Sequence, residues 1–175
     1  MTTQGGGWTV FQKRFDGSVN FQRNWYDYKH GFGNVSGEYW LGLDFIHSLT
    51  NTTKTELLIW GKAFDNEENF ARFEGFRVED EAAKYRVTTG TEKEGKYHES
   101  FLTHDGMFFT TYDVDNDMDS DGNCAADLSG GWWWRACLFM NLNGDYTSGK
   151  KYAIVDWKHW KGHEESLKET KMMIR

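Results

Sequence analysis

The sequence predicts a strand-rich α+β domain with a few short helices. Its 175 residues suffice for one domain with a buried core. Aromatic residues make up 17% of the chain, and they recur with β-branched residues in short runs typical of strands. Nineteen glycines and no proline indicate that glycines build many turns. The chain has no internal repeat, heptad pattern or low-complexity linker, so a single domain is expected.

The first half of the chain holds a predicted hairpin and a predicted helix. Residues 8–25 carry two aromatic and β-branched runs around Asp16-Gly17, a pattern that predicts a β-hairpin. Residues 39–49 have leucine or phenylalanine at positions 41, 45 and 49, so we expect a short amphipathic helix.

Most of the remaining elements are predicted to be strands. Residues 90–106 are polar and weakly patterned, so a surface loop is expected there. Apolar residues alternate at the C-terminal end, up to Ile174. The other strand candidates are residues 55–64, 66–78, 81–89 and 107–112.

Charge and hydropathy exclude several classes of function. The formal net charge is −7 and the pI is about 5.3, so the chain lacks the basic character of nucleic-acid binders. The same charge disfavours an anionic membrane surface. No apolar run approaches the roughly 18 residues of a membrane span. The opening residues lack the pattern of a secretory signal, which fits a cytosolic protein or a trimmed secreted one.

An acidic stretch organises the second half of the chain. Aspartates occupy every second position from Asp113 to Asp121. Their charges repel one another unless solvent or a cation neutralises them. Oxygen donors in an irregular loop suit Ca²⁺ better than Mg²⁺, and a solvated loop without metal is the alternative. The spacing does not fit an EF-hand, because neither possible frame places a glutamate at position twelve.

The only two cysteines follow the acidic stretch. Cys124 and Cys137 are 13 residues apart, which excludes a CxxC redox or zinc motif. N-glycosylation sequons at Asn34 and Asn51 favour an extracellular protein, although paired thiols also occur in reducing compartments. We interpret the two cysteines as a disulfide, which would contribute roughly 3 kcal/mol in the chain-entropy model.

Catalytic motifs are absent or incomplete. Residues 144–151 match most of a phosphate-binding loop but end in lysine where serine or threonine is needed. The six histidines are scattered, and the sequence has no HExxH or GxSxG motif. Residues 132–134 are three tryptophans that could stack on a sugar, although buried packing is the commoner fate of tryptophan. We therefore expect no enzymatic activity.

Six strings carry a resemblance that covers most of the chain in order. They are GGGWTVFQKRFDGSVNFQRNW, YKHGFGNVSGEYWLGLDFIH, YDVDNDMDSDGNCA, GGWWWRAC, NLNG and SLKETKMMIR. The chain resembles the fibrinogen C-terminal domain family, which includes ficolins, tachylectins, angiopoietins and tenascins. The resemblance implies an antiparallel sheet with short helices and a loop-rich subdomain that binds calcium and ligand. That domain would span residues 1–175 and lack the usual N-terminal subdomain and first disulfide.

The resemblance also implies a Ca²⁺ site closed by a disulfide between the two cysteines. Its carboxylate ligands fall on Asp115 and Asp117. Main-chain carbonyls complete the shell with water, the first at Asp119. The second falls on Asp121 when counted forward, or on Gly122 when counted back from the cysteine.

A ligand pocket is implied beside that site. In acetyl-binding members, aromatic rings hold a methyl group while main-chain amides hold its carbonyl, and the peptide before the second cysteine is cis. Leucines stand here where the family usually has an aromatic residue and a histidine. The corresponding positions are Leu128, Ala136, Cys137, Leu138, Tyr152, Ala153 and His163.

Taken together, these features predict a secreted, calcium-stabilised recognition domain without catalysis. We incline slightly to a lectin for acetylated or related glycans, as in innate-immune members of the family. The alternative is a module that binds a cell-surface or matrix protein, as in angiopoietin-like or tenascin-like members. Multimers are expected only in a longer parent protein, whose arms would raise avidity.

Overall fold

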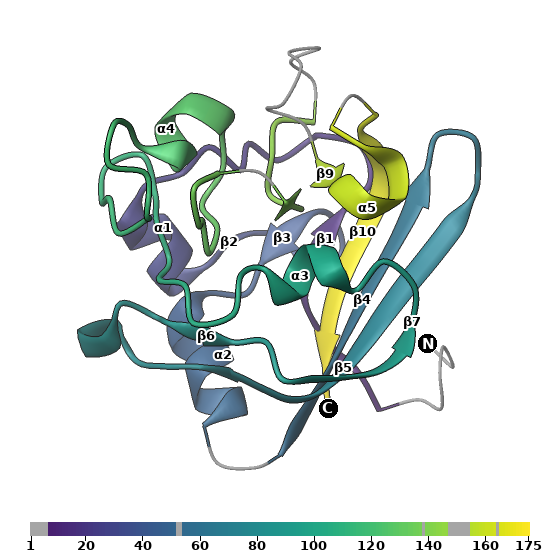
Figure 1. Cartoon of the computed structure of the whole chain (residues 1–175), viewed down its shortest axis with the longest axis horizontal. Helices are drawn as coiled ribbons and strands as arrows, with labels where there is room; N and C mark the ends of the chain where they lie inside the picture. The colour runs from purple at the N-terminus through teal and green to yellow at the C-terminus, as the bar shows by residue number, and fades with distance from the viewer. Residues whose placement is uncertain (1–6, 52–53, 138, 147–154, 164) are drawn as a thin grey trace.

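The computed structural model describes residues 7–51, 54–137, 139–146, 155–163 and 165–175 (Figure 1). Its helices are α1 (Trp25–His30), α2 (Leu43–Thr50), α3 (Glu99–Leu102), α4 (Cys124–Leu128), α5 (Lys158–Lys161) and the 3-10 helix η2 (Glu81–Ala83). Its strands are β1 (Thr9–Arg14), β2 (Phe32–Gly33), β3 (Tyr39–Trp40), β4 (Thr55–Ala63), β5 (Glu68–Val78), β6 (Val87–Thr88), β7 (Thr91–Gly95), β8 (Met140–Asn141), β9 (Asp156–Trp157) and β10 (Leu167–Ile174).

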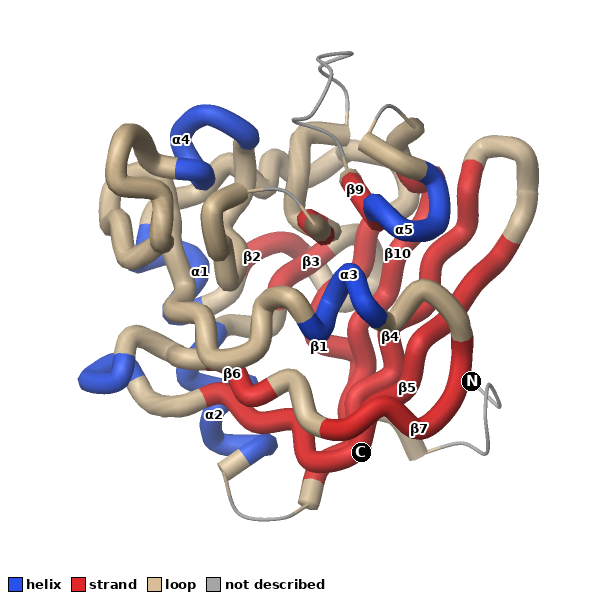
Figure 2. Tube along the Cα trace, viewed as in Figure 1, coloured by secondary structure: helices blue, strands red, loops and turns tan. Residues whose placement is uncertain are grey.

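One antiparallel sheet dominates the fold (Figure 2). Its strand order is β2-β3-β1-β10-β4-β5-β6, and β7 also pairs with β5. The last strand lies between β1 and β4, so Ile174 is opposite both Thr9 and Leu57. The two ends of the chain thus meet in the middle of the sheet, and the predicted α+β class is confirmed.

The sheet strands that the sequence predicts most clearly are those with period-two burial. The strands predicted for residues 55–64 and 66–78 correspond to β4 and β5. Along most of both strands, buried side chains alternate with partly exposed ones. The alternation at the C-terminal end corresponds to β10. A buried sheet face explains the alternation, while Leu58 and its partner Met173 are also buried on the other face.

The hairpin predicted for residues 8–25 is wrong in its second half. The first run forms β1, but it pairs with β10 and β3 rather than with the residues after the Asp16-Gly17 turn. The carboxylate of Glu38 accepts hydrogen bonds from main-chain N–H groups of the turn and its exit. Those donors are therefore satisfied without a partner strand.

The helix predicted for residues 39–49 is shorter than expected and buries a different face. Tyr39–Trp40 are strand β3, and the helix begins at Leu43. Its buried residues are Leu43, Ile46 and Thr50, whereas Phe45 is 59% exposed. Among the described residues, no helix is long and apolar enough to cross a membrane.

Two further predictions need correction. Residues 90–106 are not one loop, because they contain the edge strand β7 and the helix α3. Residues 107–112 form only isolated bridges, in which Thr110 pairs with Trp132 and Thr111 with Val114. Of residues 81–89, only β6 is strand.

The three tryptophans of residues 132–134 belong to the core. Each of them is fully buried. Trp133 makes edge-on contacts with Trp132 and Phe109, an arrangement that aromatic rings prefer. A side chain at Gly131 would approach the Tyr28 ring to 2.6 Å, so glycine is needed where the chain enters this cluster. The tryptophans therefore offer no stacking platform for a sugar.

Candidate functional site

The acidic loop, residues 113–123, is anchored to neighbouring core segments at its start and in its middle. At its start, Thr110 and Trp132 exchange main-chain hydrogen bonds of 2.9 and 3.2 Å. Asn116 Nδ2 donates to the Phe109 carbonyl at 2.9 Å. Further along, the N–H of Met118 donates to the carbonyl of Arg135 at 2.7 Å. The core thus holds a highly charged loop at the surface.

The alternating aspartates shape the loop through their own main chain. The N–H of Asp117 donates to Asp115 Oδ1, that of Asp119 to Asp117 Oδ1, and that of Asp121 to Asp119 Oδ1. Aspartate side chains commonly accept from the N–H two residues on, and they form turns in this way. Each bond uses one carboxylate oxygen, so the second oxygen of each side chain is not used in the turns.

Asp117 is the most constrained of these carboxylates. Its Oδ2 accepts from the N–H of Cys124 at 2.8 Å, which ties the loop to the start of α4. Burial raises the pKa of Asp117, and the charges of Asp115 and Asp119 raise it further, against the hydrogen bonds that lower it. Negative charge is therefore unfavourable here, and a cation would relieve that cost. This donor chemistry fits Ca²⁺.

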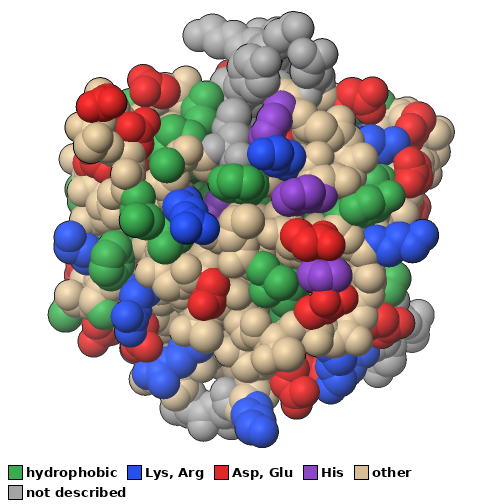
Figure 3. Space-filling model, in the orientation of Figure 1, with side chains coloured by type: hydrophobic (Ala, Val, Ile, Leu, Met, Phe, Trp, Pro, Cys, Tyr) green, Lys and Arg blue, Asp and Glu red, His purple; other side chains and the backbone are tan. Residues whose placement is uncertain are grey.

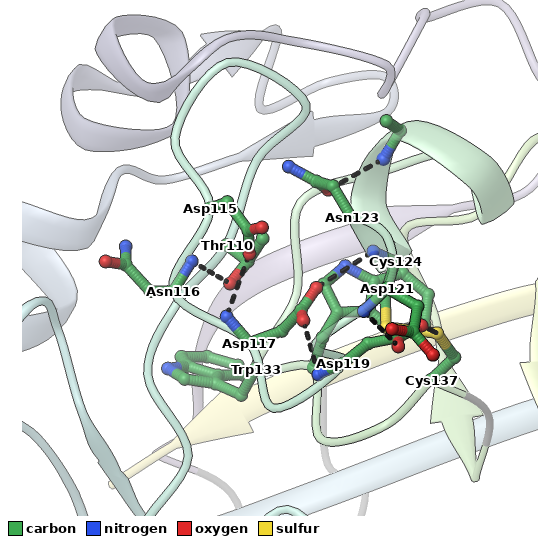
Figure 4. Close-up of a disulfide and its surroundings, with 12 residues drawn as sticks. Thr110, Asp115, Asn116, Asp117, Asp119, Asp121, Asn123, Cys124, Trp133 and Cys137 are labelled. Carbon is green, nitrogen blue, oxygen red and sulfur yellow. Dashed lines mark hydrogen bonds between the residues drawn. A yellow bond between two sulfur atoms is a disulfide. The ribbon is translucent and has the colours of Figure 1, made fainter.

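Side chains alone do not form a closed cage in the described part of the chain. Figure 4 shows the carboxylates of Asp117, Asp119 and Asp121 near the disulfide, whereas Asp115 lies towards Thr110. Among the described residues, the one group of three ligand-type side chains with atoms within 4.8 Å is Asp119 with the two cysteines, whose sulfur atoms are already bonded to each other. A cation would therefore need main-chain oxygens as well, as the resemblance implies.

Asp127 is a further carboxylate that sequence reasoning missed. A Cβ built at Gly122 would lie 3.1 Å from Asp127 Oδ2 and 3.7 Å from Asp119 Oδ2, so these groups face the same glycine. The helix α4 turns Asp127 back towards the loop, because Asn123 caps it by accepting from the N–H of Ala126. The signal in the sequence was the capping asparagine four residues before Asp127.

The predicted disulfide is confirmed. Cys124 and Cys137 are bonded, with their Cα atoms 5.3 Å apart. The prediction of a cis peptide bond before Cys137 is wrong, since the described residues contain no cis bond. Cys137 instead has a φ of 74°, a left-handed conformation that few non-glycine residues adopt.

The residues expected to line an acetyl pocket are only partly described. Leu128 ends α4 and packs partly buried against the core. Ala136 is exposed, while Cys137 and His163 are half-buried. The other three expected positions lie outside the described residues; they are Leu138, Tyr152 and Ala153. The pocket stays a prediction.

His163 has a buried partner that the sequence did not reveal. Its Nδ1 lies 3.0 Å from Oδ2 of Asp156, which is fully buried in β9. Burial raises the pKa of Asp156 to about 8, with a smaller opposite effect of Lys158. Burial also lowers the pKa of His163, as does Lys158. Burial thus disfavours the charged form of both groups, and a protonated Asp156 would donate to the imidazole.

The Asp156 burial predicts a fall in stability above pH 6.5. An acid whose pKa is raised on folding contributes its full stability below the pKa of the unfolded state, which is near 3.8 for Asp156. This contribution falls as the pH rises and is lost by about pH 8, the pKa in the folded domain. Burial lowers the pKa of His104 to about 4, so His104 produces an opposite slope between pH 4 and 6.5. From pH 6.5 to 8 only the Asp156 slope remains, about 1.4 kcal/mol per pH unit, or about 2 kcal/mol in all.

Urea denaturation at several pH values checks this slope. Asp156→Asn should make stability flat from pH 6.5 to 8. Asp65→Asn is the control, because Lys161 lowers the pKa of that exposed carboxylate and it titrates far below this range. Parallel curves for the unmutated chain and Asp156→Asn would contradict the assignment.

The acidic loop also carries apolar side chains into solvent. Met118, between two of the aspartates, is 61% exposed, and Tyr112 at the loop entry is 46% exposed. Hydrophobic and acidic side chains lie side by side at the upper left of Figure 3, over this part of the fold. We use the name loop face for Tyr112 and Met118 together with the five aspartates of the acidic loop.

Comparisons with known proteins agree with the architecture. Residues 1–175 match the family model described as fibrinogen beta and gamma chains, C-terminal globular domain. The chain is 44% identical to microfibril-associated glycoprotein 4 of Bos taurus, over 100% of this chain and 71% of that protein. It is 46% identical to fibrinogen C domain-containing protein 1 of Macaca fascicularis, over 100% of this chain and 42% of that protein. The fibrinogen-like globe domain of human ANGPTL2 superposes with a TM-score of 0.93 at 45% identity, over 98% of this chain and 81% of that one.

Proposed function

This chain belongs to the fibrinogen C-terminal domain family, and from that premise we propose that it is an extracellular, non-catalytic recognition domain that binds a protein through its loop face. The relatives' names support an extracellular setting, since one is a microfibril-associated glycoprotein. The Cys124–Cys137 disulfide also suits an oxidising compartment.

The observation that carries the proposal is the exposed pair Tyr112 and Met118 among carboxylates. Large exposed apolar side chains ringed by charge are typical of protein interfaces, in which tyrosine and methionine are enriched. Five aspartates from Asp113 to Asp121 leave the loop face acidic even with one divalent cation bound. The partner surface should therefore carry an apolar centre and a basic rim.

A glycan ligand is the second candidate, and it has less support. From the sequence alone, a glycan ligand was slightly favoured over a protein partner. However, the three tryptophans of residues 132–134 are buried, and the imidazole of His163 is engaged with Asp156. In its favour, Ala136 is exposed next to Cys137, where the main chain could hold an acetyl carbonyl.

Binding arrays distinguish the two candidates. A multimerised form of the chain would be applied to purified extracellular receptor and matrix domains and to N-acetylated glycans. We expect binding to a basic protein domain that weakens in salt and falls about tenfold when Tyr112 and Met118 become alanine. The matched control is Phe45→Ala with Leu49→Ala, an exposed apolar pair on α2.

Two results would contradict the proposal. Protein binding that both double variants retain equally would place the interface elsewhere. Binding to acetylated glycans that Tyr152→Ala abolishes, without any protein binding, would favour the lectin.

We also propose that the acidic loop holds Ca²⁺. Asp115 and Asp117 would supply carboxylate oxygens, and main-chain carbonyls would come from Asp119 and from Asp121 or Gly122. A bound cation would neutralise charge around the half-buried Asp117, whose raised pKa supports the proposal. It would also hold Met118 in one position on the loop face.

Calcium is expected to stabilise the domain by about 2.7 kcal/mol at 100 times its Kd, because only the folded loop presents all its ligands. Thermal melting with and without Ca²⁺ measures this, with Mg²⁺ for comparison. Asp115→Asn with Asp117→Asn should abolish the shift. Glu68→Gln with Glu94→Gln removes the same charge from exposed sheet positions and should retain it. An unmutated chain that melts at the same temperature with and without calcium would refute the site.

A further inference from the structure

The turn between β2 and β3 holds the first of the two sequons, Asn34-Val35-Ser36. The N–H of Gly37 donates to the Asn34 carbonyl at 2.8 Å, and the N–H of Asn34 donates to the Glu38 carbonyl at 3.0 Å. These bonds close a tight turn within five residues. All the bonds of the turn are therefore local in the sequence.

The side chain of Asn34 is oriented by the serine of the same sequon. Asn34 Oδ1 accepts from the N–H of Ser36 at 2.9 Å and from Ser36 Oγ at 2.8 Å. The main-chain N–H can only donate, so it must face the amide oxygen, and this assigns the two ends of the Asn34 amide. The amide nitrogen takes no part in these bonds. A group attached to Asn34 Nδ2 would therefore leave every hydrogen bond of the turn intact.

The turn is also open to solvent. Asn34 and Ser36 are exposed, and the side chain of Val35 between them is 73% exposed. A hollow of about 210 Å³ lies beside Val35, lined in part by Phe32 and Tyr39. The folded domain thus has room for a bulky substituent at this position.

We propose that Asn34 is an N-glycosylation site. The co-reactant is an oligosaccharide linked to a lipid diphosphate, supplied by the secretory pathway. A bond forms between Asn34 Nδ2 and C1 of the first sugar while the C1–oxygen bond to the diphosphate breaks. The lipid diphosphate leaves with the bonding electrons, and the amide proton passes to a base of the transferase. The Ser36 hydroxyl positions the amide through its bond to Oδ1.

A glycan at Asn34 would screen one edge of the sheet. β2 is the terminal strand in the sheet order and is only two residues long. Exposed strand edges invite pairing with other chains, and a bulky hydrated group beside β2 would block this. The proposal concerns Asn34 alone, because two residues of the second sequon, Thr52 and Thr53, lie outside the described residues.

The test is peptide mapping of the chain secreted from a eukaryotic cell behind a secretory leader. We expect a glycan on the peptide that contains Asn34, and an amidase that hydrolyses the glycosylated side-chain amide should release the glycan and leave aspartate at that position. Asn34→Gln and Ser36→Ala should both lose the glycan. Ser36→Thr should keep it, because threonine provides the same hydroxyl.

Two features keep the test decisive. The unmutated chain alone answers the question if a variant fails to be secreted. Ser36→Ala retains the asparagine, so loss of the glycan in this variant separates the sequon from the turn. An unmodified Asn34 peptide from unmutated, disulfide-bonded protein, secreted by cells that glycosylate a reference glycoprotein, would overturn the proposal.

Discussion

Replacement of Glu38 by alanine is expected to destabilise the domain by about 3 to 5 kcal/mol. Glu38 is fully buried, and its carboxylate accepts four hydrogen bonds of 2.7 to 3.1 Å from main-chain N–H groups. The donors are Phe15, Asp16, Gly17 and Val19. Arg14, itself buried, places Nε 3.7 Å from Glu38 Oε2. Truncation would leave the four donors without an acceptor and the guanidinium without its nearest counter-charge.

The pKa of Glu38 agrees with this role. Burial disfavours its ionisation, but the main-chain donors and Arg14 outweigh burial and hold its pKa below the ordinary value. Glu38→Gln should be milder than Glu38→Ala, because the amide oxygen can still accept while the charge is lost. The control is Glu68→Ala, an exposed glutamate of the same sheet, for which a change within about 0.5 kcal/mol is expected.

Urea denaturation of the three variants measures these differences. If Glu38→Ala shifted the midpoint no more than Glu68→Ala does, the carboxylate would not organise the turn. A structure of Glu38→Ala in which residues 15–19 keep their native conformation would also show that another group satisfies the four donors.

Reduction of the Cys124–Cys137 disulfide is expected to lower the free energy of unfolding by about 3 kcal/mol, because the unfolded chain gains the freedom of a short closed loop. The bond joins the start of α4 to the segment after the buried tryptophans. Since the N–H of Cys124 also donates to Asp117 Oδ2, reduction should weaken calcium affinity as well.

Urea midpoints with and without a reductant measure this effect. Cys124→Ala with Cys137→Ala should resemble the reduced chain and be insensitive to the reductant, which controls for effects elsewhere. Two reactive thiols in protein made under oxidising conditions, or a midpoint that the reductant leaves unchanged, would contradict the expectation.

Local patterns predicted the long strands well and the short elements poorly. In β4 and β5 most buried side chains recur at every second position, so the strands are visible in the sequence, although Leu58 is also buried and the phase changes between Phe73 and Phe76. The residues after Gly17 have a similar composition but form no strand. Glu38, about twenty residues away, accepts from the N–H groups of Gly17 and Val19, and local side chains accept from those of Ser18 and Gln22. The buried face of α2 was predicted wrongly. The helix packs against β5, and this contact, rather than the spacing of leucine and phenylalanine in the sequence, decides which of its residues are buried.

The candidate site divides in the same way. The spacing of the aspartates, the pairing of the two cysteines and the resemblance to the fibrinogen C-terminal family are properties of neighbouring residues, and the sequence alone determined them. The tertiary structure decided that Asp127 turns towards Gly122 and that Asp156 is buried against His163. It also decided that Met118 is exposed while the three tryptophans are not. The spacing between neighbouring residues can be read from one segment of the sequence. The burial and charge environment of a residue depend on segments far away in the chain, which only folding brings together.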